Sequence, residues 1–539
     1  MTAYLYNLKI PIEKDGGDLK QLAAESLGLE GKEVLEAALL RKSLDARKKP
    51  QLFFNLKLRL RLQPSAVRKP GLRKKLVKEE PEEGLPKIRG EKVLQGPPVV
   101  CGSGPAGLFC ALVLAEGGLA PVVLERGARM EKRVQAVEDF WKKNVFNPVT
   151  NVPFGEGGAG TFSDGKLTAR TQSPLTRKVL ETFVEAGADP GILTAGSPHV
   201  GTDALQKVVV AIRERICSLG GSFRFETALE DLSSMEDGDG WKHVREVRLH
   251  GGGTLKAGLL VLATGHSARD TTRNLIRRGL PFEGKGFSLG ARIEHPASLI
   301  NRCQYGREDQ ETLDRLGNSE YHLTSQGERG VYSFCMCPGG VVVPSNSFPG
   351  EVVTNGMSYS ARNGALSNSA IVVTVSPEDF GGGALEGLAW QEAIEQKAYQ
   401  LAGGYLATGQ NAQDFVEGRE SREVSTGFQP TYKPGIRLGN LWEILPKEVA
   451  EAMRRGLLDF DRKLPGFVSQ GFLTGPETRT SSPVRLKRDE NLKVLGYNNL
   501  YAAGEGAGYA GGIVSAGADG IRAALAILQE YGAWKEEEQ

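Results

Sequence analysis

The chain has 539 residues, more than one compact core usually holds, so we expect two to four domains. Hydrophobic residues make up 40% and charged residues 24%, which excludes a disordered polyelectrolyte and a collagen-like repeat. Lys and Arg number 67 against 65 Asp and Glu, so the whole chain lacks the charge excess that indicates a nucleic-acid or membrane partner.

Cysteine use and the N-terminus indicate the compartment. The six cysteines, at 101, 110, 217, 303, 335 and 337, are too few for a disulfide scaffold and have no C-x-x-C or zinc spacing. Met1-Thr-Ala-Tyr is not a basic segment followed by an apolar one, and no apolar run approaches the ~18 residues of a membrane span. We therefore expect a cytoplasmic protein with no signal peptide and no membrane partner. The six histidines show no ligand spacing, so no metal is expected.

The first 92 residues carry 21 basic and 13 acidic side chains, a net charge of +8. We interpret residues 1–92 as a small basic α/β module with its linker. Strands are predicted over 4–10 and 52–62, the second because apolar and mostly basic residues alternate in it. Helices are predicted over 18–27 and around 34–40. The charged, proline-containing stretch 64–86 is typical of a linker.

The basic face of strand 52–62 has two interpretations. It is either an ordinary solvated surface or a docking surface for RNA or an acidic partner. Phe53 and Phe54 do not distinguish the two, because Phe54 falls in phase with the apolar face.

A β-α-β unit follows and carries the strongest motif. A strand over 98–101 precedes Gly102-Ser-Gly-Pro-Ala-Gly107, a helix is predicted over 108–115, and a strand over 121–124 ends at Glu125. In a dinucleotide-binding turn the three glycines permit the tight turn, the approach of a pyrophosphate and close helix–strand packing. The helix N-terminus offers N–H groups to phosphates. Glu125 is placed to bind the adenosine ribose and would repel a 2′-phosphate, which favours FAD or NAD over NADP. The alternative is a glycine-rich turn without a ligand.

Three later segments favour FAD. Residues 155–166, Gly-Glu-Gly-Gly-Ala-Gly-Thr-Phe-Ser-Asp-Gly-Lys, offer flexible backbone and two hydroxyls to a ligand. Residues 259–265 form an apolar strand that ends in Ala-Thr-Gly, as in flavoproteins of this type. Residues 499–508 predict a strand and a glycine loop, and a helix starts within 511–517. Such a loop and helix can cover a ribityl chain and aim N–H groups at the O2 side of a flavin.

The pattern between these motifs predicts further elements. A strand-rich region runs from 286 to about 375. No second dinucleotide fingerprint is found, because Gly506–Gly511 matches G-x-G-x-x-G but no strand ending in an acid follows it. The predicted helices cover 203–219, 385–405 and 512–528, and the predicted strands cover 222–229, 244–249, 254–263, 286–294, 331–337 and 499–503.

Together these segments resemble a glutathione-reductase-like flavoprotein with two dinucleotide folds. More narrowly, the chain is similar to a poorly characterised family of FAD-dependent dehydrogenases of bacteria and plastids. One departure is Glu505, where many members of the superfamily have an Asp that binds a ribityl hydroxyl. The resemblance spans about 96–530, and its motifs are G-S-G-P-A-G at 102–107, L-E-R-G at 124–127, F-G-E-G-G-A-G-T-F-S-D-G-K-L at 154–167, A-T-G-H-S-A-R-D at 263–270, L-G-A-R-I-E-H-P at 289–296, F-C-M-C-P-G-G at 334–340 and G-E-G-A-G-Y-A-G-G-I at 504–513.

This resemblance implies an α/β chain with a Rossmann-like FAD-binding domain. We expect that domain to comprise 96–285 and 484–530, with a mixed α+β substrate or cap domain, 286–483, inserted between them. Arg126 and Arg133 either pair with the pyrophosphate or cap the first loop. The residues expected to bind FAD are Gly102, Ser103, Gly104, Pro105, Ala106, Gly107, Glu125, Arg126, Arg133, Gly158, Ala159, Gly160, Thr161, Lys166, Ala263, Thr264, Gly265, Gly504, Glu505, Gly511, Gly512 and Ile513.

The catalytic group is not fixed by any motif, because hydride transfer at a flavin needs orientation more than acid–base chemistry. Cys335 and Cys337 are either structural strand residues or a redox pair, although alternate strand residues sit ~6–7 Å apart, which is poor for a disulfide. Lys166 either stabilises charge on the flavin or is an ordinary solvated lysine. His266 and His295 are either proton donors or structural histidines.

Three functions remain open. The first is an FAD-dependent oxidoreductase that acts on a small organic substrate, with NAD(P)H or another electron donor. The second is an FAD-dependent RNA-modifying enzyme that grips RNA through the basic N-terminal module, in which case binding depends on salt. The third is a protein in which FAD is structural.

Overall fold

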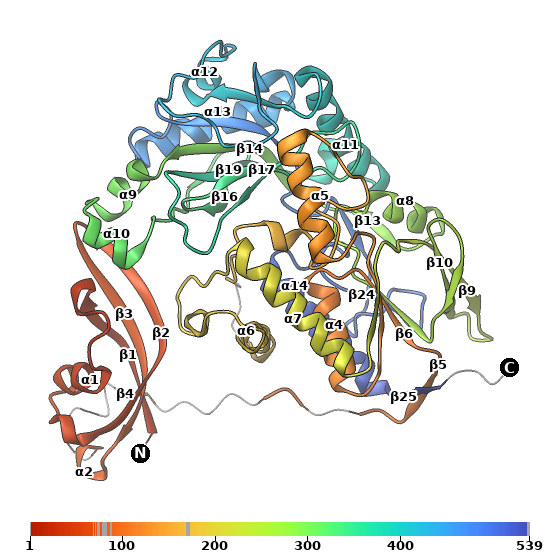
Figure 1. Ribbon diagram of the computed structural model, residues 1–539, viewed down its shortest axis with the longest axis horizontal. Coiled ribbons are helices and arrows are strands. Elements are labelled where there is room, and N and C mark those ends of the chain that lie inside the picture. The colour runs from red at the N-terminus through yellow and green to blue at the C-terminus, as the bar shows by residue number, and fades with distance from the viewer. Residues whose placement is uncertain are drawn as a thin grey trace.

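A computed structural model of the protein describes residues 2–67, 69, 72, 76–77, 84–86, 89–168 and 173–535. Three regions are distinguished in Figure 1: an N-terminal module, a parallel sheet with its helices, and a larger mixed sheet. Within the described residues, no helix is long and apolar enough to cross a lipid bilayer.

The N-terminal module is an antiparallel sheet of four strands in the order β2-β3-β1-β4, with helix α1 against its apolar face. The helix predicted around residues 34–40 is wrong, since these residues begin the 15-residue strand β2. Pairing with β3 along its length outweighs the helix propensity of Leu, Glu and Ala. The linker predicted over 64–86 lies partly outside the described residues. The elements are β1 Thr2–Pro11, α1 Leu19–Leu27, β2 Val34–Lys48, β3 Gln51–Leu62, α2 Pro64–Val67 and β4 Leu76–Val77.

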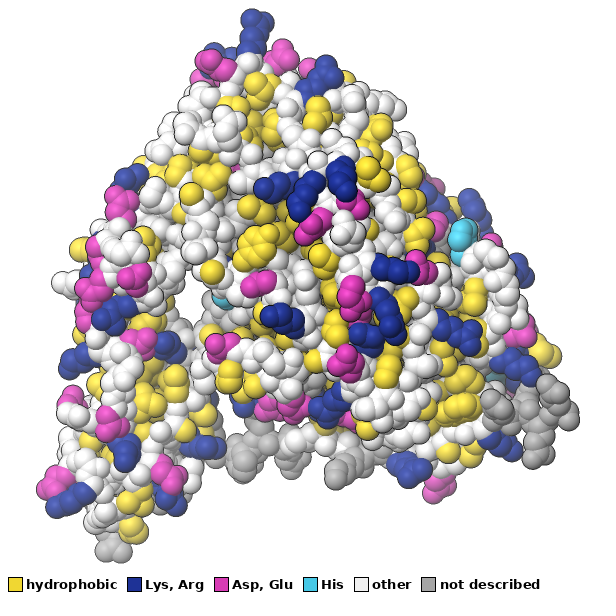
Figure 2. Space-filling view, in the orientation of Figure 1, with side chains coloured by type: hydrophobic (Ala, Val, Ile, Leu, Met, Phe, Trp, Pro, Cys, Tyr) yellow, Lys and Arg dark blue, Asp and Glu magenta, His cyan; other side chains and the backbone are white. Residues whose placement is uncertain are grey.

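The module touches the rest of the molecule at two places. The backbone of Lys42 in β2 exchanges hydrogen bonds with residues 194 and 196, and Arg307 pairs with Glu13 at 3.2 Å. Between the two contacts an opening is visible in Figure 2. The helices at the second contact are α9 Ala297–Tyr305 and α10 Gln310–Leu316.

A five-stranded parallel sheet in the order β24-β12-β6-β7-β8 forms the centre of the first of the two main regions. The predicted strand 254–263 is two strands, β11 and β12, because Ala257 and Gly258 have no strand conformation. The predicted strand 222–229 ends at Arg224. The strands are β6 Pro98–Cys101, β7 Val122–Leu124, β8 Ser222–Arg224, β12 Leu259–Leu262 and β24 Leu500–Ala502.

Helices cover one face of this sheet and a small antiparallel sheet packs near the other. Helices α4 and α14 cross closely, since a methyl group at Gly520 would stand 2.0 Å from the carbonyl oxygen of Ala106. Both are apolar, which suits a buried position. The elements are α4 Pro105–Glu116, α5 Met130–Lys143, α6 Pro174–Glu185, α7 Thr202–Ser218, α8 Arg269–Arg277, α14 Ile513–Glu530, β9 Leu229–Glu236, β10 Lys242–Leu249 and β11 Thr254–Lys256, with the pairs β5 Lys92–Gln95 and β25 Tyr531–Lys535, and β13 Phe282–Gly284 and β23 Val484–Leu486.

The other main region, called the second region from here on, is a seven-stranded mixed sheet in the order β15-β16-β19-β14-β22-β20-β21. Strand β14 alternates Leu289, Ala291 and Ile293, which belong to the apolar core, with Ser288, Arg292 and Glu294, and all six are buried. A buried polar face needs partners from other elements. The elements are β14 Phe287–Pro296, β15 Thr324–Ser325, β16 Val331–Cys337, β17 Val341–Pro344, β18 Thr354–Met357, β19 Leu366–Val375, α11 Ala384–Ala402, β20 Ala407–Asn411, α12 Ala412–Glu417, β21 Ile436–Leu438, α13 Lys447–Lys463 and β22 Phe472–Glu477.

The parallel-sheet strands come from before residue 286 and after residue 483, and those of the seven-stranded sheet from between. The four domain boundaries themselves stay predictions. A buried ion network joins the two regions. Arg269, at the start of α8, contacts Glu351 and lies 2.9 Å from Glu395, and Arg479 lies 2.8 Å and 2.6 Å from the same two carboxylates.

We expect Arg269→Leu to lower the free energy of unfolding by about 3–5 kcal/mol, because it leaves two buried carboxylates with one cation. The measurement is a urea unfolding curve. The control is Arg177→Ala, which removes a half-exposed pair with Glu181 and should change stability by less than about 1 kcal/mol. Equal midpoints for both variants would show that the network does not stabilise the fold.

Candidate functional site

Four glycine-containing loops, from distant parts of the sequence, meet at the ends of the parallel strands. A methyl group at Gly102 would stand 2.2 Å from the Ala263 carbonyl oxygen, and one at Gly158 2.8 Å from the Gly104 Cα atom. The late loop lies against the same assembly, since a methyl group at Gly504 would stand 2.7 Å from the Ala106 Cβ atom. The structure therefore brings together the four segments that the sequence predicts to hold a dinucleotide.

The first turn has the backbone that the glycine spacing predicts. Gly102 has a φ of +109°, a backbone angle that residues with a side chain rarely adopt. A methyl group at Gly107 would stand 1.9 Å from the Gly102 carbonyl oxygen. Gly104 differs, because its φ is −70° and the nearest atom to an added methyl group, the Gly158 Cα atom, would be 3.8 Å away. The protein alone therefore has room for a side chain at Gly104.

Two helix N-termini point to this place. Helix α4 starts at Pro105 and α14 at Ile513, and Gly160 lies between them, since its added methyl group would be 3.0 Å from Ile513 and 3.8 Å from Pro105. The first N–H groups of a helix have no acceptor within the helix and form the positive end of its dipole. This arrangement suits a ligand with phosphates or developing negative charge.

Glu125 holds the loops together. Its Oε2 atom accepts hydrogen bonds from the Ser103 backbone N–H (3.0 Å) and hydroxyl (2.7 Å), and its Oε1 atom accepts from the N–H groups of Gly127 (2.9 Å) and Gly155 (3.0 Å). The carboxylate is buried. All four acceptor positions of the carboxylate are in use, so Glu125 links three loops by hydrogen bonds. Its contact with a ribose stays a prediction.

The two arginines expected near the pyrophosphate are engaged by the protein. Arg133 is fully buried, and its five N–H groups donate to the carbonyls of Asn151, Val152, Gly155, Glu156 and Gly158. Arg133 therefore shapes loop 151–158, which agrees with the second of its two expected roles, and its contact with a pyrophosphate stays a prediction. Arg126 donates to Asp270 and Thr271, each at 2.8 Å.

Two polar side chains in these loops remain available to a ligand. The hydroxyl of Thr161 is buried and has no hydrogen-bond partner among the described residues. Glu505 accepts from the Ser482 N–H through Oε1 at 2.9 Å, and a methyl group at Gly511 would stand 2.4 Å from its Oε2 atom. Burial raises the pKa of Glu505, against the opposing effect of Lys285. Both groups fit a ligand rich in hydroxyls and ring nitrogens.

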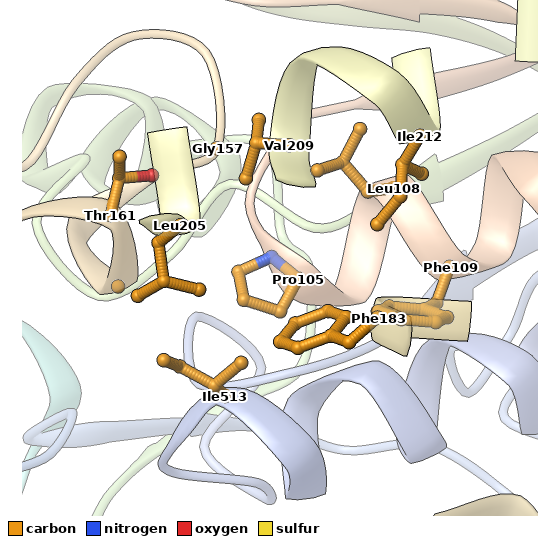
Figure 3. A pocket seen from close by; sticks show the side chains of 11 residues that line it. Pro105, Leu108, Phe109, Gly157, Thr161, Phe183, Leu205, Val209, Ile212 and Ile513 are labelled. Carbon is orange, nitrogen blue, oxygen red and sulfur yellow. The ribbon is translucent and has the colours of Figure 1, made fainter. Parts of the chain in front are cut away.

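A small apolar pocket borders the two helix N-termini. Figure 3 shows Pro105 among apolar side chains from α4, α6, α7 and α14. Its lining has almost no polar surface, so it suits an apolar ring or a methyl group rather than a phosphate. The lining residues are Pro105, Leu108, Phe109, Gly157, Gly160, Thr161, Phe183, Leu205, Val209, Ile212 and Ile513.

Lys166 and the two cysteines lie together at the second region. The Lys166 ammonium donates to the Met336 carbonyl oxygen and is 4.0 Å from Asp164 and 3.9 Å from Glu320. Cys335 is exposed and Cys337 is buried. The lysine is therefore anchored to β16, and its contact with a flavin stays a prediction.

The two histidines differ. His295 is buried, donates from Nε2 to the Phe467 carbonyl at 2.7 Å and packs on the Phe467 ring. Burial lowers its pKa to about 4, so it is a neutral structural residue. His266 follows the Ala-Thr-Gly strand end and is half-buried. Burial, aided by Arg479, lowers its pKa to about 4.

The sequence analysis missed the buried arginines. Arg292 donates to Glu477 (2.5 and 3.0 Å), to the Cys335 carbonyl (2.8 Å) and to the amide oxygens of Asn355 (2.9 Å) and Asn368 (3.1 Å). Arg269 and Arg479 share two glutamates. Arg269 and Arg292 stand in two of the quoted motifs, so the sequence offered a reason to single them out. The sequence does not show which carboxylate a buried arginine contacts. Among the described residues, no group of three or more His, Cys, Asp and Glu could hold a metal ion.

Comparison with known proteins places this site in a family. Residues 286–480 match the family model of an FAD-dependent protein, C-terminal domain-like, and residues 2–61 match a domain of unknown function. An uncharacterized protein of Clostridium beijerinckii is 41% identical over 538 residues, which cover 98% of this chain and 99% of that one. The chain belongs to this family of FAD-dependent proteins. FAD is accordingly its cofactor.

Two solved structures show distant likenesses. The halogenase PltM is 12% identical over 80% of this chain and 68% of its own, with a TM-score of 0.36. The L-proline dehydrogenase from P. horikoshii is 11% identical over 81% of this chain and 94% of its own, also with a TM-score of 0.36. At these values the likenesses carry no argument about the site.

The buried carboxyl group of Glu294 on β14 should make the free energy of unfolding depend on pH. It is fully buried, and its carboxylate accepts hydrogen bonds from the backbone N–H and hydroxyl of Thr431. Burial raises its pKa to about 7, although Thr431 and Arg292 oppose the shift. A carboxyl whose pKa is higher in the folded state stabilises the fold below its unfolded pKa, and this contribution is lost as pH rises through the folded pKa.

We therefore expect Glu294→Gln to gain stability relative to the wild type as pH rises from about 4.5 to about 7, by up to about 3 kcal/mol. The measurement is the difference between the urea unfolding free energies of the two proteins at pH 5 and pH 8. Other titrating groups cancel in this difference. A difference that does not depend on pH would contradict the assignment.

Proposed function

We propose that this protein is an FAD-dependent oxidoreductase that transfers a hydride between the flavin and a small organic substrate. The observation that carries the proposal is the meeting of four glycine loops and two helix N-termini at one place, next to accessible side chains of the second region. Those side chains include Cys335, which is exposed although charged and polar groups surround it.

The residues fit FAD part by part. The N-terminus of α4, with Gly104 open beside it, suits the pyrophosphate, and Glu125 keeps the turn in shape. The Thr161 hydroxyl and the Glu505 carboxylate are placed to bind polar atoms of the ribityl chain or ring. The N-terminus of α14, from Gly512, stabilises negative charge on the reduced ring. When bound, the flavin supplies a hydride acceptor or donor at N5.

The second region supplies the wall against which a substrate lies. Buried ion pairs of Arg269 and Arg479 with Glu351 and Glu395 fix its position. The loop after β12 therefore keeps the same position relative to the seven-stranded sheet. His266 and Lys285 are partly accessible, Cys335 is exposed, and the three come from both sides. These side chains orient a substrate and exclude water from it.

The first test is the visible absorbance of the purified protein, with the chromophore then released by heat and identified. We expect a flavin spectrum with FAD in the released fraction, and bleaching by the physiological donor under anaerobic conditions. Bleaching by NADH or NADPH makes the protein a reductase. A bound flavin that no donor or substrate reduces would favour structural FAD. A colourless protein that does not take up FAD would refute the proposal.

A glycine pair separates cofactor binding from folding. We expect Gly104→Ala to unfold at the same urea concentration as the wild type but to bind FAD at least about tenfold more weakly, because only the pyrophosphate needs the space beside Gly104. Gly107→Ala is the contrast, since its methyl group meets the Gly102 carbonyl oxygen at 1.9 Å and should lower stability even without FAD. Unchanged FAD affinity in Gly104→Ala would place the pyrophosphate elsewhere.

A further inference from the structure

The two cysteines of the Cys335-Met336-Cys337 segment differ from residues of a regular strand. The pairing of β16 with β19 shifts register between Phe334 and Cys337, and Cys335 has a φ of +43°. In a regular strand the side chains of residues i and i+2 are too far apart for easy closure of a disulfide. Here the bulge and the left-handed residue interrupt the strand between the two thiols.

Hydrogen bonds and two cations hold this segment. The Cys337 Sγ atom lies 3.2 Å from the carbonyl oxygen of Cys335, so this side chain turns back toward its neighbour. Nη1 of Arg292 lies 2.8 Å from that same oxygen and 3.8 Å from the Cys337 sulfur. Lys166 is anchored on the carbonyl oxygen of Met336, between the two cysteines. Two cations therefore stand beside one pair of thiols.

The pair also lies where the two main regions meet. Lys166 ends the segment 155–166, whose glycines touch the dinucleotide turn at Gly104. Cys335 is solvent-accessible, while Cys337 is fully buried. One cysteine is thus accessible to a reaction partner, and the other is enclosed by the protein.

We propose that Cys335 and Cys337 form a reversible disulfide that exchanges two electrons with the FAD. This inference rests on the proposed function. In the oxidising direction the two S–H bonds break and one S–S bond forms, while two electrons and two protons pass to FAD and give FADH2. The reverse step cleaves the disulfide at the expense of FADH2. The fully oxidised protein, with FAD and the disulfide, therefore accepts four electrons, two at the flavin and two at the disulfide.

The surroundings set the pH dependence of this exchange. Burial raises the pKa of Cys337 to about 12, although Arg292 and Lys166 act in the opposite direction. The attacking species is the thiolate. The exchange between dithiol and flavin therefore becomes faster as pH rises from 7 to 10.

The test is an anaerobic dithionite titration of the air-oxidised holoprotein, followed at the flavin absorbance and by thiol counts in denaturant. We expect the wild type to take up four electrons per FAD. It should show four free thiols before reduction and six after it, since the chain has six cysteines. Cys335→Ser should take up two electrons and show five thiols throughout. Cys335 is exposed, so this substitution leaves the core intact.

Cys217→Ser is the matched control, because Cys217 is exposed on α7, away from the pair. It should still take up four electrons. A wild type with bound FAD that takes up two electrons and shows six thiols after air oxidation would overturn the dithiol and leave the proposed function standing. A protein that holds no FAD would overturn both. Cys337→Ser, with the same loss of two electrons, confirms the partner.

Discussion

A buried network of two arginines and two glutamates fixes the relation between the two main regions. Arg269 begins α8, directly after the loop that leaves β12, while Arg479, Glu351 and Glu395 belong to the second region. The charges cancel, but each ion has lost its water, so the free energy is favourable only when the partners keep their geometry. A shift of the seven-stranded sheet would separate buried charges. The wall of the cofactor site is therefore as rigid as this network.

The same use of charge recurs inside the loops. Arg133 spends its five N–H groups on backbone carbonyls, and Glu125 accepts four hydrogen bonds from three loops. Both ions shape the glycine loops and leave little charge for a ligand. In the proposed arrangement the phosphates meet backbone N–H groups and the dipole of α4, and the dipole of α14 serves the flavin ring. Such dipoles are preorganised by the fold and need no side chain to move when the ligand arrives.

The limits of sequence reasoning follow from the range of the interactions. The turn at Gly102–Gly107 was predicted correctly, because the β-α-β unit is local and the contacts that require Gly107 lie within the turn itself. The strand at Val34 was missed, because it depends on pairing with β3 and not on its own propensity. Arg133 was expected either to pair with the pyrophosphate or to cap the first loop, and its carbonyl partners, which lie 18 to 25 residues away in loop 151–158, could not be named from the sequence. The partners of a buried ion are set by the tertiary fold, so they cannot be predicted from sequence spacing.

Charge balance also bears on the chemistry at the junction of the two regions. Arg292 is neutralised by Glu477, and Arg269 and Arg479 by Glu351 and Glu395. These pairs keep their geometry, so the groups that can still respond to a substrate are His266, Lys285, Glu505 and the two thiols. His295, neutral and packed on Phe467, is not among them. A site with few free charges and rigid walls suits hydride transfer, in which the alignment of donor and acceptor matters more than proton transfer by a side chain.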